Sequence, residues 1–328
     1  MGQHTNAKAV GFIGLGNVGA KLAGSLLRNG VELTVRDLDE AAVAPLLDKG
    51  AKGADSPKQM AEACDIIITC LPSPSISAAV MEAEDGVLAG FAAGGSSKGK
   101  IWAEMSTTDE TEIHRLAEKV TSLGGQAVDC PVSGGCHRAA TGNISIFAGC
   151  ERSTFEAMLP YLTKMGRRIL HTGGLGSATV LKVVTNYLAT ANLVSVAEAL
   201  ATCKAANMDL RTSFEAIRIS SGNSFVHETE SQVILNGSRD INFTMDLVLK
   251  DVSLFYDVAQ RAGLTLEMAP LLKQIFADGI DQFGPREFSP NIIKRIEQPF
   301  GLDVTADGFP AEITDDEPEV EGYEVKLS

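Results

Sequence analysis

Basic residues are scarce in this sequence of 328 residues, and no long stretch is free of polar side chains. Lys and Arg number 28 against 42 Asp and Glu, which gives a formal net charge of −14. A surface of this sign repels nucleic-acid phosphates and anionic lipid headgroups, so we expect neither as a partner. The most apolar long stretch, Val180–Leu200, contains Lys182, Asn186, Asn192 and Glu198. These side chains predict a buried helix and not a membrane span.

The sequence also lacks the usual signs of disulfides, metal sites and secretion. Its six cysteines form no CxxC pair, and the start MGQHTNAKAV has no apolar signal segment. We therefore expect reduced thiols and a cytoplasmic location. Four histidines show no metal-ligand spacing and are expected to be structural: His114, His137, His171 and His227.

Short apolar runs alternate with helical patterns up to about residue 173. The runs are AVGFIG, ELTVR, DIIITC, KIWAEM, GQAVDC and ISIFAG. This alternation is typical of an α/β protein with a Rossmann-type, doubly wound parallel sheet. Residues 1–173 are the predicted NAD-binding domain. Residues 174–300 read as an all-helical domain that begins with a long interdomain helix, and we expect the active site between the two domains.

The end of the chain, residues 301–328, has a different composition. It holds nine acids and one lysine, and so carries more than half of the net charge. A segment of this composition buries little apolar surface, and we expect a solvated or loosely docked tail. Deleting it is then expected to leave the fold and nucleotide binding intact.

The segment GFIGLGNVG has the GxGxxG spacing between a strand and a helix. Gly14 permits the tight turn, Gly16 lets the backbone approach a pyrophosphate, and Gly19 lets the helix pack on the strand. With Asn17 and Val18, these residues are the predicted phosphate-binding turn, although glycines can also serve packing alone.

Asp37 follows the second predicted strand, about 18 residues after Gly19. A carboxylate there accepts hydrogen bonds from the adenosine ribose of NAD and repels the extra phosphate of NADP. The sequence therefore predicts NAD as the cofactor. A helix cap at Asp37, or a phosphate contact from Arg36, is the alternative interpretation.

Taken with this turn, the chain resembles the β-hydroxyacid dehydrogenases, the family of 3-hydroxyisobutyrate and tartronate semialdehyde dehydrogenases, with 6-phosphogluconate dehydrogenase as a larger relative. The resemblance rests on four segments in order: GFIGLGNVG, DCPVSGG at 129–135, GSATVLKVVTN at 176–186 and LVLKDVSL at 247–254. It implies hydride transfer between NAD and a small hydroxy acid or semialdehyde.

The resemblance also assigns roles to residues. It implies that Ser133, Gly134 and Gly135 bind the substrate carboxylate, and consecutive glycines with a serine do suit an anion. The same loop could be a plain turn. Further cofactor contacts that it implies are Leu71, Pro72, Ser106, Thr107 and Lys250. Each of these could equally be a cap, a turn or a surface residue, and Lys250 could simply pair with Asp251 or Asp246.

Lys182 and Asn186 stand four residues apart, so both project from one face of the long predicted helix. A lysine in an apolar helix loses hydration, which favours its neutral form and suits it to proton transfer. The resemblance assigns Lys182 as the general acid/base and Asn186 as the residue that orients the substrate hydroxyl. The alternative is a lysine whose stem is buried and whose ammonium reaches solvent.

The match to the family has gaps. Ala178 and Thr185 stand where the family commonly has glycine and asparagine, and Arg138 follows the substrate loop where small residues are usual. Arg138 could bind a second anionic group or lie on the surface. An imine reductase on the same scaffold and an NAD-binding regulatory protein remain alternative functions. The apolar long helix further predicts a homodimer or homotetramer.

Overall fold

The computed structural model describes residues 8–93 and 97–327, so most of the N-terminal segment considered for a signal lies outside the described residues. The chain divides into two units. Unit 1 comprises residues 1–182 and 315–328, and unit 2 comprises residues 183–314. Each unit is described by itself.

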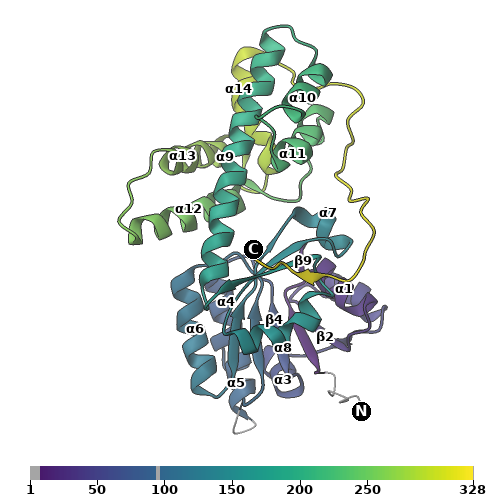
Figure 1. The fold of residues 1–328 in the computed structure, drawn as a ribbon, viewed down its shortest axis with the longest axis vertical. Helices are drawn as coiled ribbons and strands as arrows, with labels where there is room; N and C mark the ends of the chain where they lie inside the picture. The colour runs from purple at the N-terminus through teal and green to yellow at the C-terminus, as the bar shows by residue number, and fades with distance from the viewer. Residues whose placement is uncertain (1–7, 94–96, 328) are drawn as a thin grey trace. The chain divides into compact units, whose positions relative to one another are not determined.

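Figure 1 shows the sheet of unit 1 with helices beside it. The strand order in this sheet is β10-β9-β8-β6-β5-β4-β1-β2-β3. The strands are β1 Val10–Ile13, β2 Leu33–Arg36, β3 Lys52–Gly53, β4 Ile66–Thr69, β5 Ile101–Glu104, β6 Gln126–Asp129, β7 Val132–Ser133, β8 Ser145–Gly149, β9 Arg168–Gly173 and β10 Tyr323–Glu324. From β3 to β6 all neighbours are parallel, while β8 runs antiparallel to β6 and β7. The order reverses between β1 and β4, which is where doubly wound sheets bind ligands.

Helices cover both faces of this sheet. They are α1 Gly19–Arg28, α2 Glu40–Leu47, α3 Pro57–Ala63, α4 Pro74–Glu82, α5 Val87–Ala93, α6 Glu110–Ser122, α7 Gly135–Ala140 and α8 Arg152–Leu162. Side chains alternate along the strands, so Ile66 and Ile68 of β4 pack in the cluster that includes α1, whereas Ile67 packs in the cluster that includes α6. Strands buried on both faces explain the continuous apolar runs in the sequence.

Unit 2 is helical. Its helices are the rest of α9 Ser177–Ala205, then α10 Leu210–Arg218, α11 Phe225–Asn236, α12 Met245–Arg261, α13 Met268–Phe283, the 3₁₀ helix η1 Ser289–Ile293 and α14 Lys294–Phe300. These elements confirm the predicted fold class of a doubly wound sheet followed by an all-helical part.

The long helix α9 supplies much of the core of unit 2. By length and composition it is apolar enough to cross a membrane, a property that core helices of soluble proteins share. Leu193, Ala197 and Leu200 are buried in one cluster with Phe276 of α13. α9 therefore packs as a core helix of this unit.

The expectation of a loosely docked acidic tail is wrong. Val304 is fully buried in the core of unit 2, and Asn236 Nδ2 donates to the Phe309 carbonyl at 2.8 Å. Further on, β10 extends the sheet of unit 1 beside β9. The number of acidic residues wrongly suggested a solvated tail, because apolar residues are interspersed among them. In addition, the cations that pair with these acids lie far away in the sequence.

Candidate active site

The glycine-rich turn joins β1 to α1 with little space to spare. Gly14 has φ +96°, and a Cβ there would lie 2.2 Å from the Cys70 carbonyl oxygen. A Cβ on Gly19 would lie 2.0 Å from the Gly14 carbonyl oxygen. By contrast, no described atom outside its immediate neighbours lies within 4 Å of a Cβ built on Gly16. The first and third glycines are thus needed for packing, and the second leaves open space above the turn.

This open space meets the N-terminus of α1, where Asn17 and Val18 precede the helix. Val18 is the N-cap residue and makes no side-chain cap, whereas Asp39, Ser56, Ser73 and Asp109 cap α2, α3, α4 and α6. A helix N-terminus without a side-chain cap leaves its positive end open, which suits a phosphate group. The turn therefore fits the pyrophosphate of a dinucleotide.

Asp37 lies directly beside this turn. Its Oδ2 accepts a hydrogen bond from Leu15 N at 2.6 Å, and its Oδ1 accepts one from Asp39 N at 2.9 Å. Arg36 Nη1 instead donates to the Ala54 carbonyl at 3.1 Å. The side chain after β2 that contacts the glycine-rich turn is thus the carboxylate of Asp37. A carboxylate at this position favours the ribose hydroxyls of NAD over the added phosphate of NADP.

The ends of β4 and β5 join through a buried chain of hydrogen bonds. Leu71 N donates to Ser106 Oγ at 2.7 Å, and Ser106 Oγ donates to Glu104. Burial raises the pKa of Glu104 above its ordinary value, although hydrogen bonds from Ser106 oppose this. Two predicted cofactor contacts therefore meet at the carboxyl edge of the sheet, and Pro72 and Thr107 follow them directly in the sequence.

The predicted substrate loop lies between β7 and α7. Ser133 pairs with Ser145 of β8, and Gly134 and Gly135 follow with φ values of +129° and +85°. Both values lie in the left-handed region that favours glycine. One side of the loop is thus fixed by the sheet and the other by the start of α7.

Asp129, the last residue of β6, connects this loop to α9. Its carboxylate is fully buried and accepts hydrogen bonds from Gly176 N at 2.8 Å and Thr179 N at 2.7 Å. Desolvation by burial raises its pKa from 3.8 to about 6, against the effect of these hydrogen bonds. Lys182 follows Thr179 by three residues, so its side chain leaves the same face of α9, and it is only 8% exposed.

Asn186 stands one turn further along α9 and belongs to unit 2. Its Nδ2 donates to Asp251 Oδ2 at 2.5 Å, while Lys250 Nζ lies 2.8 Å from Asp251 Oδ1. Asp251 is only 2% exposed. The structure thus brings Asn186 and Lys250 together on one buried carboxylate, and the pairing of Lys250 with Asp251 is one of the two that the sequence offered.

Sequence reasoning assigned no role to Asp129 or Glu104, and it named Asp251 only as a possible ion-pair partner of Lys250. The signal for the first two is their position at strand ends, where open α/β sheets place ligand-binding residues. Asp251 carries a weaker signal, as an acid that follows Lys250 in the mostly apolar segment LVLKDVSL. Within residues 8–93 and 97–327, no group of three or more His, Cys, Asp or Glu side chains could hold a metal ion.

Comparisons with known proteins agree with this arrangement. The profile of the NAD binding domain of 6-phosphogluconate dehydrogenase matches residues 9–173. The profile described as NAD-binding of NADP-dependent 3-hydroxyisobutyrate dehydrogenase matches residues 176–295. The chain belongs to the β-hydroxyacid dehydrogenase family.

Two curated β-hydroxyacid dehydrogenases and one solved structure illustrate the similarity. The 2-(hydroxymethyl)glutarate dehydrogenase of Eubacterium barkeri is 34% identical, over 90% of this chain and 97% of its own length. The NAD-dependent L-serine dehydrogenase of Pseudomonas aeruginosa is 31% identical, over 89% and 98%. A 3-hydroxyisobutyrate dehydrogenase structure from Salmonella typhimurium has a TM-score of 0.79 and 26% identity, and covers 88% of this chain and 99% of its own.

These relatives confirm an NAD-dependent hydroxy acid dehydrogenase that acts on a small molecule. Their names give different substrates, so membership of the β-hydroxyacid dehydrogenases fixes the reaction class and not the substrate.

Proposed function

We propose that the chain oxidises the alcohol of a small β-hydroxy acid, or reduces the corresponding semialdehyde, with Lys182 as the general acid/base. The hydrogen-bonding of Asp129 carries this proposal. One carboxylate ends the strand that leads to the Ser133–Gly135 loop and also holds the first turn of the helix that bears Lys182. Asp129 is thereby linked both to the loop that suits a substrate carboxylate and to the helix turn that precedes the nearly buried Lys182.

The turn at Gly14–Gly19 suits the pyrophosphate of a dinucleotide, which supports binding of NAD at the adjacent edge of the sheet. The proposed contacts of NAD at this edge come from Asp37, Leu71, Pro72, Ser106 and Thr107. The nicotinamide of bound NAD supplies the hydride acceptor. In oxidation, the substrate hydroxyl gives its proton to the neutral amine of Lys182, and in reduction the ammonium returns it.

Substrate binding and orientation fall to two groups of residues. Ser133 and the backbone of Gly134 and Gly135 hold the carboxylate, and the bond from Asn186 to Asp251 fixes the amide that orients the reacting hydroxyl. Lys250 belongs to the same group through its ion pair with Asp251.

A regulatory protein that binds NAD without turnover is disfavoured, because such a protein needs no nearly buried lysine on a helix that Asp129 links to an anion-binding loop. An imine reductase is disfavoured by the same lysine, because its substrate has no hydroxyl proton to be moved. The relatives named after hydroxy acids and L-serine support the dehydrogenase.

We further propose a cytoplasmic homodimer or homotetramer. Leu188 of α9 and Leu271 of α13 are each 53% exposed in the single chain, which leaves apolar side chains for a partner copy to cover. Light scattering on the purified protein measures this directly, and a monomer at micromolar concentration would contradict it.

A screen of small 3-hydroxy acids and L-serine, followed by the absorbance of NADH, tests the function. We expect turnover of at least one acid and loss of most kcat/KM with its amide, because the loop donors then face no charge. Turnover of simple alcohols at an equal rate would contradict the role of the loop. An absence of turnover with every hydroxy acid and every semialdehyde would contradict the proposal as a whole.

A further inference from the structure

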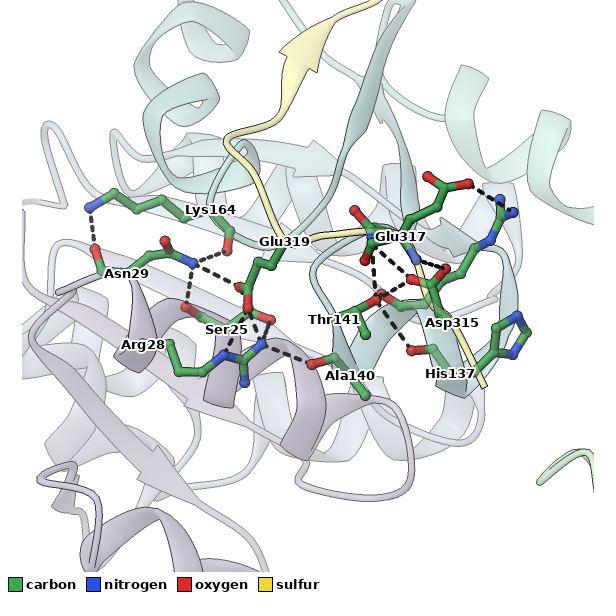
Figure 2. Close-up of polar contacts among 12 residues, drawn as sticks. Ser25, Arg28, Asn29, His137, Ala140, Thr141, Lys164, Asp315, Glu317 and Glu319 are labelled. Atoms are coloured by element: carbon green, nitrogen blue, oxygen red, sulfur yellow. Dashed lines mark hydrogen bonds and ion pairs between the residues drawn. The ribbon is translucent and has the colours of Figure 1, made fainter. Parts of the chain in front are cut away.

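Residues 315–327 belong to unit 1 and lie beyond the part of the chain that either family profile matches, which ends at residue 295. β10 adds to the sheet beside β9, with Tyr323 N donating to the Arg167 carbonyl at 3.0 Å. Arg152 binds the Glu324 carboxylate through both terminal nitrogens, at 2.6 and 3.0 Å. The segment before β10, residues 315–319, is therefore anchored downstream and runs over α1 and α7 (Figure 2).

Asp315 binds the C-terminal end of α7. Its Oδ2 accepts a hydrogen bond from the Thr141 hydroxyl (Figure 2). It accepts another from Asn143 Nδ2 at 2.8 Å. Thr141 is the C-cap residue of α7, and Asn143 is only 1% exposed. Asn143 Nδ2 also lies 2.9 Å from the Glu317 carbonyl oxygen. Hydrogen bonds to a charged acceptor are stronger than neutral ones, so Asp315 ties the segment to the end of α7.

A second acid holds the neighbouring helix end. Glu319 accepts hydrogen bonds from Arg28 Nε at 3.1 Å and from Asn29 Nδ2 at 3.2 Å. Arg28, the last residue of α1, donates in turn to the carbonyl of Ala140, the last residue of α7, at 2.9 Å. The segment thus joins the C-terminal ends of two helices, and Figure 2 shows both contacts side by side.

The opposite ends of these helices carry the two candidate ligand loops. α1 begins at the glycine-rich turn, and α7, which is six residues long, begins at Gly135 of the substrate loop. Because α7 is less than two turns of rigid backbone, fixing its C-terminal end at Thr141 also fixes where Gly134 and Gly135 point. Arg138 of α7 faces the segment as well, with its Nη2 3.7 Å from Glu317 Oε1.

We propose that Asp315 is a positioning residue for substrate binding, which acts through Thr141 and Asn143 on the Ser133–Gly135 loop. The inference rests on the proposed role of that loop in binding the substrate carboxylate. Asp315 itself contacts no reacting atom, so its loss should weaken substrate binding while leaving NAD binding unchanged.

The neighbouring acid offers a matched control. Asp316 has the same charge, is exposed and makes no hydrogen bond or ion pair with any residue in the described part of the chain. The Asp315→Ala and Asp316→Ala variants change the net charge equally, so a difference between them reports the contacts of Asp315. The Asp315→Asn variant keeps one acceptor oxygen and serves as the milder change if the alanine variant does not fold.

The experiment measures KM for substrate, KM for NAD and kcat, together with hydrogen exchange of residues 133–143 in the unliganded protein. We expect Asp315→Ala to raise the substrate KM about fivefold or more and to speed exchange in this peptide. The KM for NAD should stay near wild type. Asp316→Ala should match wild type throughout, and Asp315→Asn should lie between the two.

Unchanged substrate KM in Asp315→Ala would overturn the proposal, whether or not exchange changes. So would an equal effect of Asp316→Ala. If the wild-type protein turns over no hydroxy acid or semialdehyde, the proposed function fails, and hydrogen exchange still decides separately whether Asp315 orders the loop.

Discussion

Replacing Asp129 by asparagine is expected to change how the stability of unit 1 depends on pH. Burial raises the pKa of this carboxyl from 3.8 to about 6. Folding therefore favours its protonated form, and the stability from this group is fully present below pH 3.8 and is lost as the pH rises through about 6. At about 1.4 kcal/mol per pH unit, the total loss is about 3 kcal/mol.

Roughly half of this loss, about 1.4 kcal/mol, falls between pH 5.0 and 7.5. The Asp129→Asn variant cannot titrate there, so wild type should lose about 1.4 kcal/mol relative to the variant over this interval. Trp102 is the one tryptophan of the sequence and is buried in β5, so its fluorescence during urea unfolding reports unit 1. If the free energy of unfolding changed with pH in the same way in wild type and in the variant, the reasoning about this carboxyl would be refuted.

The same substitution should reduce turnover. Gly176 N and Thr179 N donate to different oxygens of Asp129, so an asparagine can keep only one of these two hydrogen bonds in the present geometry, because its side-chain nitrogen is a donor. The first turn of α9 must then shift, and a displacement of about 1 Å near reacting groups costs up to ~10²-fold. We therefore expect kcat of the Asp129→Asn variant to fall by about tenfold to ~10²-fold. A variant with wild-type kcat would show that Asp129 does not position Lys182.

Two further predictions concern the cofactor and the tail. Asp37→Ser should improve kcat/KM with NADP relative to NAD by about tenfold or more. The reason is that the carboxylate beside Leu15 is removed and no longer repels the extra phosphate of NADP. An unchanged ratio of the two kcat/KM values would contradict the role of Asp37. Val304→Ala should lower the free energy of unfolding by about 2 kcal/mol through a cavity in the core of unit 2, measured by urea denaturation followed by circular dichroism, whereas a freely solvated tail would lose nothing.

The sheet could be predicted where each strand is an apolar run long enough to stand out. Ile66–Thr69 is such a run, because a central strand is buried on both faces. Strands of two residues, such as Val132–Ser133 and Tyr323–Glu324, carry no pattern, since they exist only through their neighbours. The path of the C-terminal segment was missed for the same reason, because Arg28 and Arg152 lie far from Glu319 and Glu324 in the sequence.

The candidate site shows the same division. The spacing of Gly14, Gly16 and Gly19 specifies a local turn, so the sequence alone could predict its geometry. The contact of Asp129 with the start of α9 joins residues 47 and 50 positions apart, and no local pattern encodes it. Positioning contacts of this kind become visible only once the chain is folded.

The central claim is that Lys182 moves the hydroxyl proton, and the Lys182→Met variant tests it most directly. Methionine fills much of the space of the nearly buried stem and removes the titrating amine, so folding and the affinity for NAD should stay near wild type. With the hydroxy acid that the wild-type protein turns over best, kcat should fall by at least the ~10²-fold typical of losing a general acid/base. A methionine variant that keeps near-normal kcat between pH 6 and 10 would contradict the account.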